Sequence, residues 1–199
     1  MNGRSLRALI NQREVGHLRE VAGLWSFQYA ASWLNHPQAF ALSPHLPLSA
    51  EPLLDGASQR PVQWYFDNLL PEEGQRTLLA GDARLDAADA FGLLAWYGAE
   101  SAGSLTLLPP EAAPQATEPL RPLPDEPLQA RILQMPKAPL THAAIKRMSL
   151  AGAQHKLAVV LQEGALFEPA GATPSTHILK PDHPDDDYPH SVINEWFVM

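Results

Sequence analysis

The chain has 199 residues, of which 45% are hydrophobic, so it is long enough to form one domain or two small ones around an ordinary core. Its formal net charge of −8, from 14 basic and 22 acidic residues, argues against a dominant basic face for binding nucleic acid. The absence of Cys excludes disulfide frameworks and thiolate metal sites. No apolar run is long enough for a signal peptide or a membrane span, so we expect a cytoplasmic protein without membrane association.

Residues 1–108 carry the patterns of a small antiparallel sheet covered by helices. Alternation of apolar and polar residues predicts strands, and apolar residues spaced by three and four predict helices. The predicted strands are 4–10, 14–18, 24–30 and 104–108, and the predicted helices are 61–70, 72–79 and 87–97, the last with Asp86 as its cap and Gly98 at its end. The sequence therefore predicts an α+β subdomain, with residues 37–61 left unassigned.

Proline marks the end of this subdomain. The chain contains 20 prolines, about twice the average usage of roughly 5%, and seven of them fall between Pro109 and Pro127. Each proline lacks a backbone donor and biases the residue before it away from helix. We therefore predict that residues 109–127 are an extended linker without regular elements.

Residues 128–199 are predicted to form a second, smaller α+β unit. A short helix is predicted over 128–134, a hairpin over 157–162 and 166–168, a strand over 177–180 and a helix from Ser191. Glu163 and Gly164 supply the predicted hairpin turn.

The stretch MSLAGAQHKLAVVL, Met148 to Leu161, joins a turn of small residues to an apolar strand. Exposed backbone N–H groups in such a turn can form a concavity for a phosphate, and Lys156 adds a positive charge just beyond it. An ordinary tight turn leading into a core strand is the alternative interpretation.

Two further charged residues follow in the order that a protein-kinase amino-terminal lobe requires. Lys180 ends an apolar strand and Glu195 lies in the last predicted helix, so the lysine could neutralise nucleotide phosphates while the glutamate orients it. The alternative is a lysine that simply marks where a strand meets water and a glutamate that faces solvent.

Three blocks, SLAGAQHKLAVVL, PSTHILKP and SVINEWF, resemble the HipA-like serine/threonine kinases, the toxins of bacterial toxin–antitoxin pairs. Two upstream blocks, WYFDNLLPEE (64–73) and GAESAGSLTLLP (98–109), resemble the amino-terminal subdomain of that family, so the resemblance covers nearly the whole chain. It implies that residues 128–199 are part of a kinase-like N-lobe that binds ATP with Mg²⁺. The implied site residues are Gly152, Ala153, Gln154 and Lys180 on the phosphates, Leu150 over the nucleotide, Glu195 beside Lys180, and Ser149 as the site of autophosphorylation.

One position departs from the family pattern. His155 stands where HipA-like kinases commonly carry an acidic residue. We therefore expect the contacts of this loop with phosphate to come from its main chain.

The resemblance also implies partners and a reaction. The parent kinase would phosphorylate a translation component such as an aminoacyl-tRNA synthetase, and a HipB-like helix-turn-helix antitoxin would hold it on operator DNA. A catalytic loop with its Asp and Asn and a metal-holding Asp are missing, and the sequence stops within SVINEWFVM. We therefore expect a truncated and catalytically inactive chain, in which any phosphate on Ser149 would come from another kinase molecule.

Two other functions fit parts of the sequence. Residues 1–108 could be a non-catalytic interaction module that docks on a kinase or an antitoxin. A cluster of potential ligands, His183, Asp185, Asp186, Asp187 and His190, would suit a divalent metal, although its prolines favour a solvated loop.

Overall fold

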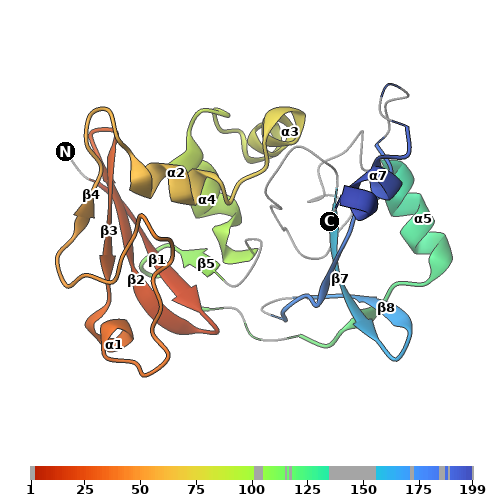
Figure 1. Cartoon of the computed structure of the whole chain (residues 1–199), viewed down its shortest axis with the longest axis horizontal. Coiled ribbons are helices and arrows are strands. Elements are labelled where there is room, and N and C mark those ends of the chain that lie inside the picture. Colours follow the sequence, from red (N-terminus) through yellow and green to blue (C-terminus); the bar gives the residue numbers. More distant parts are fainter. Residues whose placement is uncertain are drawn as a thin grey trace.

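The structure is a computed structural model that describes residues 3–100, 105–114, 116, 118–134, 156–170, 173–183, 187 and 189–198. In these residues the chain forms two antiparallel sheets, each with its own helices (Figure 1). The α+β fold class predicted from the sequence is confirmed. No helix in the described ranges is both long and apolar enough to cross a bilayer.

The first sheet has five strands in the order β4-β3-β2-β1-β5, and all neighbours are antiparallel. Its strands are β1 (Arg4–Ile10), β2 (Arg13–Val21), β3 (Leu24–Tyr29), β4 (Leu53–Leu54) and β5 (Leu105–Leu108). The predicted strands 4–10 and 24–30 agree closely with the structure, whereas β2 continues three residues beyond the predicted 14–18. The added residues matter because Glu20, in this extension, pairs with Trp25 and carries the polar contact described below.

At two positions of this unit, neighbouring atoms lie so close to the backbone that only glycine fits. A Cβ on Gly16 would lie 2.3 Å from the carbonyl oxygen of Gln28, so β2 and β3 require glycine at this crossing. A Cβ on Gly98 would lie 2.6 Å from the Cβ of Leu107 in β5. Any larger residue would therefore force the backbone to shift at either position.

Helices α2 (Pro61–Asp67) and α4 (Ala90–Tyr97) cover one face of this sheet (Figure 1). Helix α3 (Glu73–Ala83) packs beside α4, and α1 (Ala31–Leu34) lies at the end of β3. The turn η1 (Gly98–Glu100) follows α4. Phe66 of α2 packs on Phe27 of β3 with ring centroids 5.4 Å apart, and Phe91 of α4 packs edge-on against Trp25 at 5.1 Å. All four rings are buried, so the apolar stripes of the helices and the inward positions of the strands form one continuous core.

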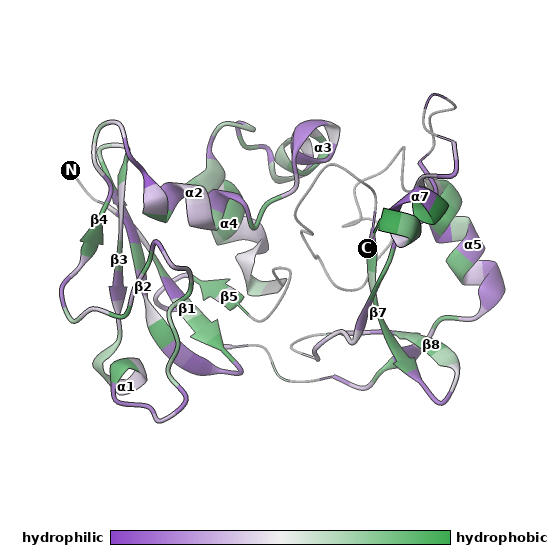
Figure 2. Cartoon of the chain, in the orientation of Figure 1, coloured by the Kyte–Doolittle hydropathy of each residue, from purple (hydrophilic) through white to green (hydrophobic). Residues whose placement is uncertain are grey.

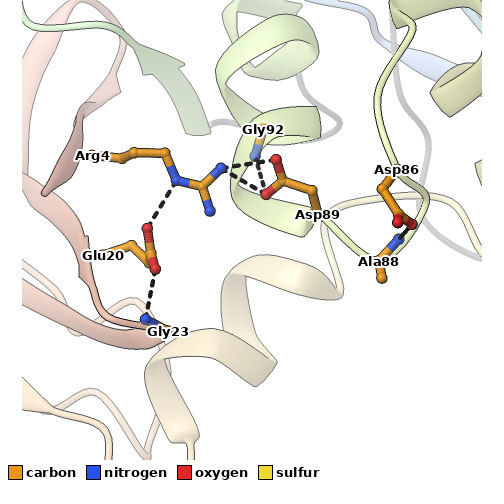
Figure 3. A network of polar contacts seen from close by, with 7 residues as sticks. All are labelled: Arg4, Glu20, Gly23, Asp86, Ala88, Asp89 and Gly92. Atoms are coloured by element: carbon orange, nitrogen blue, oxygen red, sulfur yellow. Dashed lines mark hydrogen bonds and ion pairs between the residues drawn. The ribbon is translucent and has the colours of Figure 1, made fainter.

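A polar network fastens the start of α4 to strands β1 and β2 (Figure 3). The Arg4 guanidinium donates to Glu20 at 2.8 Å and to both oxygens of Asp89 at 2.7 and 2.8 Å, and it lies 4.8 Å from the centre of the Phe91 ring. Asp89 is also the N-cap of α4, since its Oδ1 accepts from the N–H of Gly92 at 3.0 Å. The Arg4 side chain therefore links β1, the start of α4 and the aromatic core.

The cap predicted for α4 was therefore wrong. Asp86 accepts instead from the N–H of Ala88 at 2.8 Å, in the turn that precedes the helix. Both aspartates satisfy local backbone donors, but only Asp89 also meets Arg4.

The second sheet has the order β6-β8-β7-β9. Its strands are β6 (Arg121–Pro122), β7 (Leu157–Gln162), β8 (Ala165–Glu168) and β9 (His177–Leu179). The helices that accompany it in the described part of the chain are α5 (Asp125–Gln134) and α7 (Ser191–Val198). The hairpin turn between β7 and β8 lies at Glu163 and Gly164, with φ of 51° and 80°, as the sequence predicts.

The prediction that residues 109–127 lack regular elements was wrong. Strand β6 and the first turn of α5 both fall within this range. Pro122 is tolerated because β6 is an edge strand, and Pro127 is tolerated because it lies in the first helical turn, where its N–H would have no partner within the helix. The assignment of 128–199 as a separate domain stays a prediction, although this unit receives part of its sheet from the proline-rich segment.

A small second core lies between α5 and this sheet. Leu123, Leu157 and Val159 are its buried members, and Leu128 and Ile132 of α5 pack against them. Arg131 of α5 forms an ion pair with Glu168 of β8, whose side chain is only 8% exposed. Helix α7 adds no buried residue to this core, and Figure 2 shows it as strongly hydrophobic.

Candidate functional site

The structure brings Lys180 and Glu195 together. Lys180 directly follows β9, and its Nζ donates to Oε1 of Glu195 in the middle of α7. Each side chain is 34% exposed, so solvent still reaches the pair. This is the pairing that the order of strand lysine and helix glutamate predicted, while its role toward a nucleotide stays a prediction.

Hydrogen bonds at the start of α7 place Glu195 over Lys180. Asp182 Oδ1 accepts from the N–H of Val192 at 3.1 Å, and Ser191 Oγ accepts from the N–H of His183 at 2.8 Å. The chain just after Lys180 is therefore bonded directly to the first turn of α7. One helical turn later, Glu195 comes within reach of the lysine.

Sequence reasoning missed Asp182 as a residue that positions this helix. It lies two residues after Lys180 and nine before Ser191, so helix-capping patterns, which compare residues only a few positions apart, do not reveal the contact. Its position in a polar, proline-containing segment was the only signal in the sequence.

Lys156 is the second lysine of the site. Strands β7 and β9 pair with Leu157 opposite Leu179, so extending the register by one residue puts Lys156 opposite Lys180. Leu157 and Leu179 both contribute to the core under α5. Because side chains alternate between the faces of a strand, the two lysines next to them are directed to the other face.

The pKa of Lys156 reflects this environment. Burial lowers the pKa below its ordinary value, and the positive charge of Lys180 lowers it further. Glu195 and Glu72 oppose the shift, because their negative charges favour the protonated amine. The charges of Lys156, Lys180 and Glu195 therefore lie close enough to act on one another.

The remaining residues predicted for the site lie outside the described residues. These are Ser149, Leu150, Gly152, Ala153 and Gln154, which precede Lys156 in the loop. Lys156 directly follows this loop and is the last residue before β7. It is therefore the only residue of this connection that the described structure includes.

The metal site that the sequence offers as an alternative in the loop before α7 stays untested. Asp185 and Asp186 lie outside the described residues. Within the described ranges, no three His, Cys, Asp or Glu side chains gather in a way that could hold a metal ion. The backbone N–H of His183 donates to Ser191 Oγ at the start of α7.

Comparison with known proteins identifies the family. The model of the HipA N-terminal domain matches residues 6–108, which is about half of the chain, and the model of the HipA-like C-terminal domain matches residues 148–199. Y4mE of Sinorhizobium fredii is 40% identical over 179 residues, covering 87% of this chain and 41% of that protein. The serine/threonine-protein kinase toxin HipA of Shewanella oneidensis is 30% identical over 179 residues, covering 89% of this chain and 39% of that protein.

A solved structure agrees with these matches. The Shewanella oneidensis MR-1 complex of HipA, HipB and operator DNA contains a chain that aligns with a TM-score of 0.69 and 26% identity, covering 98% of this chain and 43% of that chain. The chain therefore spans about two fifths of the length of these relatives. On this evidence, the chain belongs to the HipA family of toxin kinases.

Proposed function

We propose that this chain is the nucleotide-binding amino-terminal part of a HipA-like toxin that transfers phosphate from Mg-ATP to serine or threonine. The observation that carries the proposal is the contact of Lys180 with Glu195, near Lys156, which directly precedes the neighbouring strand β7. Two ammonium groups at adjacent strand ends would meet the negative charge of nucleotide phosphates, and Glu195 would hold one of them in place.

The loop before Lys156 would supply main-chain donors to the same phosphates, from Gly152, Ala153 and Gln154, while Leu150 would cover the nucleotide. ATP would supply the phosphoryl group and Mg²⁺ would neutralise part of its charge. Lys156 and Lys180 would bind and orient the phosphates, and Glu195 would hold the Lys180 amine in position. This chain alone would bind without transferring phosphate, so Ser149 would be phosphorylated only by another, complete kinase molecule.

The proposed partners rest on the relatives. The Shewanella oneidensis structure contains HipB and operator DNA together with HipA, so a HipB-like antitoxin would bind the parent protein, and DNA would be reached through that antitoxin. An aminoacyl-tRNA synthetase would be the phosphorylated substrate. These proposals concern the whole protein, of which this chain matches about two fifths.

Titration with Mg-ATP by calorimetry tests the proposal. Lys180→Ala should abolish the binding seen with the wild-type chain, since it removes one of the two cations and leaves Glu195 unpaired. Arg19→Ala is the matched control, because it removes one positive charge from β2 in the first sheet and should leave binding unchanged. Equal binding by the wild type and Lys180→Ala would refute the proposed site.

The same titration separates a second candidate function. The first sheet and its helices have a core of their own, distinct from the one under α5, which favours residues 1–108 as a self-contained interaction module. If that is the function of the chain, Mg-ATP will not bind at all. A HipB-like or kinase partner would then bind residues 1–108 with unchanged affinity in the Lys180→Ala variant.

A further inference from the structure

Packing does little to fix the position of helix α7. None of its side chains is buried, and those of Trp196 and Phe197 are largely exposed. A helix that buries so little apolar surface gains little stability from where it lies. The directed polar contacts of Asp182, Ser191 and Glu195 therefore carry more weight in placing it.

The first turn of α7 is bonded to the segment that follows Lys180. Asp182 Oδ1 accepts from the N–H of Val192 at 3.1 Å, and Ser191 Oγ donates to the same oxygen at 3.4 Å. Ser191 Oγ in turn accepts from the N–H of His183 at 2.8 Å. The bond from a backbone N–H to a carboxylate is charge-assisted, and such bonds are stronger than those between neutral groups. Asp182 is therefore the main acceptor that this segment offers to the start of the helix.

The side of α7 that meets this segment also carries Glu195. Ser191 and Glu195 are four residues apart, so their side chains lie on one side of the helix, one turn from each other. Lys180 and Asp182 are two residues apart, just after β9. The first turn of the helix thus contacts Asp182, and the next turn contacts Lys180. Without the first contact the helix is free to rotate or shift, and the Glu195 carboxylate leaves the lysine amine.

We propose that Asp182 is a positioning residue of the nucleotide site. By bonding the first turn of α7 it holds Glu195 on Lys180, and it thereby keeps the lysine amine where the phosphates are received. The inference rests on the proposed function, because the ligand is the same nucleotide at the same lysine. Asp182 acts through Glu195 and not by touching the nucleotide. A lysine side chain that is not held must be immobilised when a phosphate binds, and this cost lowers the affinity.

Coupling with a carbodiimide tests the positioning of Glu195 and needs no nucleotide. The reagent activates a carboxylate, which a lysine amine in contact with it attacks to form an amide. The yield of the amide between Lys180 and Glu195 in the full chain, measured by mass spectrometry, therefore reports how often the two groups meet.

Two substitutions of Asp182 separate its hydrogen bond from its charge. Asp182→Asn and Asp182→Ala both remove the charge, but Asp182→Asn keeps an oxygen that can accept from the N–H of Val192. The coupling yield in Asp182→Ala should be about two- to tenfold below that in Asp182→Asn, the range expected for the loss of one acceptor at the start of a helix. Asp125→Ala is the matched control and should leave the yield unchanged, because Asp125 also lies in the first turn of a helix of this unit.

Titration with Mg-ATP by calorimetry tests the effect on the nucleotide. Asp182→Ala should raise the dissociation constant about two- to tenfold above that of Asp182→Asn, the range expected when one long side chain must be immobilised on binding. In a Glu195→Ala background the two variants should bind equally, because no carboxylate is left to be positioned. A general role of Asp182 in the stability of the unit would persist in that background.

The outcomes separate this inference from the proposed function. If the wild type binds Mg-ATP but Asp182→Ala and Asp182→Asn agree in coupling yield or in affinity, the positioning role is wrong while the proposed function stands. If the wild type does not bind Mg-ATP, the proposed function is wrong and the role toward the nucleotide falls with it, whereas the coupling yields still decide whether Asp182 positions Glu195. A lower yield and weaker binding in Asp182→Ala, with no difference in the Glu195→Ala background, support the inference.

A second variant covers the case in which Asp182→Ala does not fold, which circular dichroism would reveal. Ser191→Ala keeps Asp182 and removes only the hydroxyl that accepts from the N–H of His183. It should lower the coupling yield in the same direction, and a yield equal to that of the wild type would overturn the proposal that these contacts place Glu195.

Discussion

The two units of the chain differ in how much of their apolar surface they bury. In the first, aromatic residues from strands and helices are almost fully enclosed, including Phe27 and Phe66. Among the described residues of the second, the core under α5 is small, and Trp196 and Phe197 of α7 are 80% and 83% exposed. Buried apolar surface is the main source of stability, so the first unit should be the more stable. The candidate site lies on the weaker unit, where Lys180 and Glu195 depend on few packing contacts.

The largest expected effect is the loss of an aromatic ring from the first core. Phe66→Ala removes a fully buried ring that packs on Phe27, and we expect the free energy of unfolding to fall by about 4 kcal/mol. Denaturant unfolding followed by tryptophan fluorescence measures this change. Trp64→Ala on the same helix is the control, because its side chain is 53% exposed and its loss should cost about 0.5 kcal/mol or less. Equal costs for the two substitutions would contradict the assignment of the core.

A smaller effect is expected in the second unit from breaking its buried ion pair. Arg131→Ala leaves the carboxylate of Glu168 buried without its cation, and we expect this unit to lose about 3 kcal/mol. Hydrogen exchange should then become faster at the amides of β7 and stay unchanged in β1 and β2. Arg121→Ala, at a 54% exposed arginine on the neighbouring strand, should change neither set of rates. Faster exchange in both units after Arg131→Ala would show that they unfold together.

The smallest effect is a pH dependence within the first unit. Hydrogen bonding from Arg4 lowers the pKa of Glu20 below its ordinary value of 4.5. The contact therefore stabilises the fold above pH 4.5, and its contribution is lost as the pH falls through the lower pKa of the folded state. Because Arg4 is 45% exposed, solvent screens the pair, and the loss should stay below about 1 kcal/mol.

Denaturant unfolding of the wild type and Glu20→Gln between pH 6 and pH 3 measures this contribution. The difference in the free energy of unfolding between the two proteins should shrink as the pH falls. A difference that is constant with pH would mean that the charge of Glu20 contributes nothing.

Much of the first unit could be predicted from the sequence because its signals are local. Alternating apolar residues identify the strand over 4–10, and an apolar stripe identifies the helix that contains Val62, Phe66 and Leu69. Neither pattern requires knowledge of the neighbouring elements. Asp86 and Asp89 could not be distinguished as caps in this way, because both accept local N–H donors. Only the guanidinium of Arg4, 85 residues from Asp89 in the sequence, shows which of them fastens the helix to the sheet.

The candidate site could be predicted from the sequence only in part. Lys180 and Glu195 follow a recognisable order of strand and helix, and the structure joins them. The place of Lys156 opposite Lys180 depends on the register of β7 and β9, which the sequence does not show. The prediction for the proline-rich segment was wrong for a similar reason. A proline in an edge strand or in a first helical turn costs little stability, and the sequence alone does not reveal which strand lies at the edge of a sheet.

The most direct test of the account uses an ATP acyl phosphate, which transfers its acyl group to lysine amines beside the bound phosphates. Labelling should occur at Lys156 or Lys180, be blocked by an excess of Mg-ATP, and disappear from Lys156 when the chain is denatured before the reagent is added. Labelling spread over other lysines, or labelling that Mg-ATP does not reduce, would contradict the claim that this pair of lysines receives nucleotide phosphates.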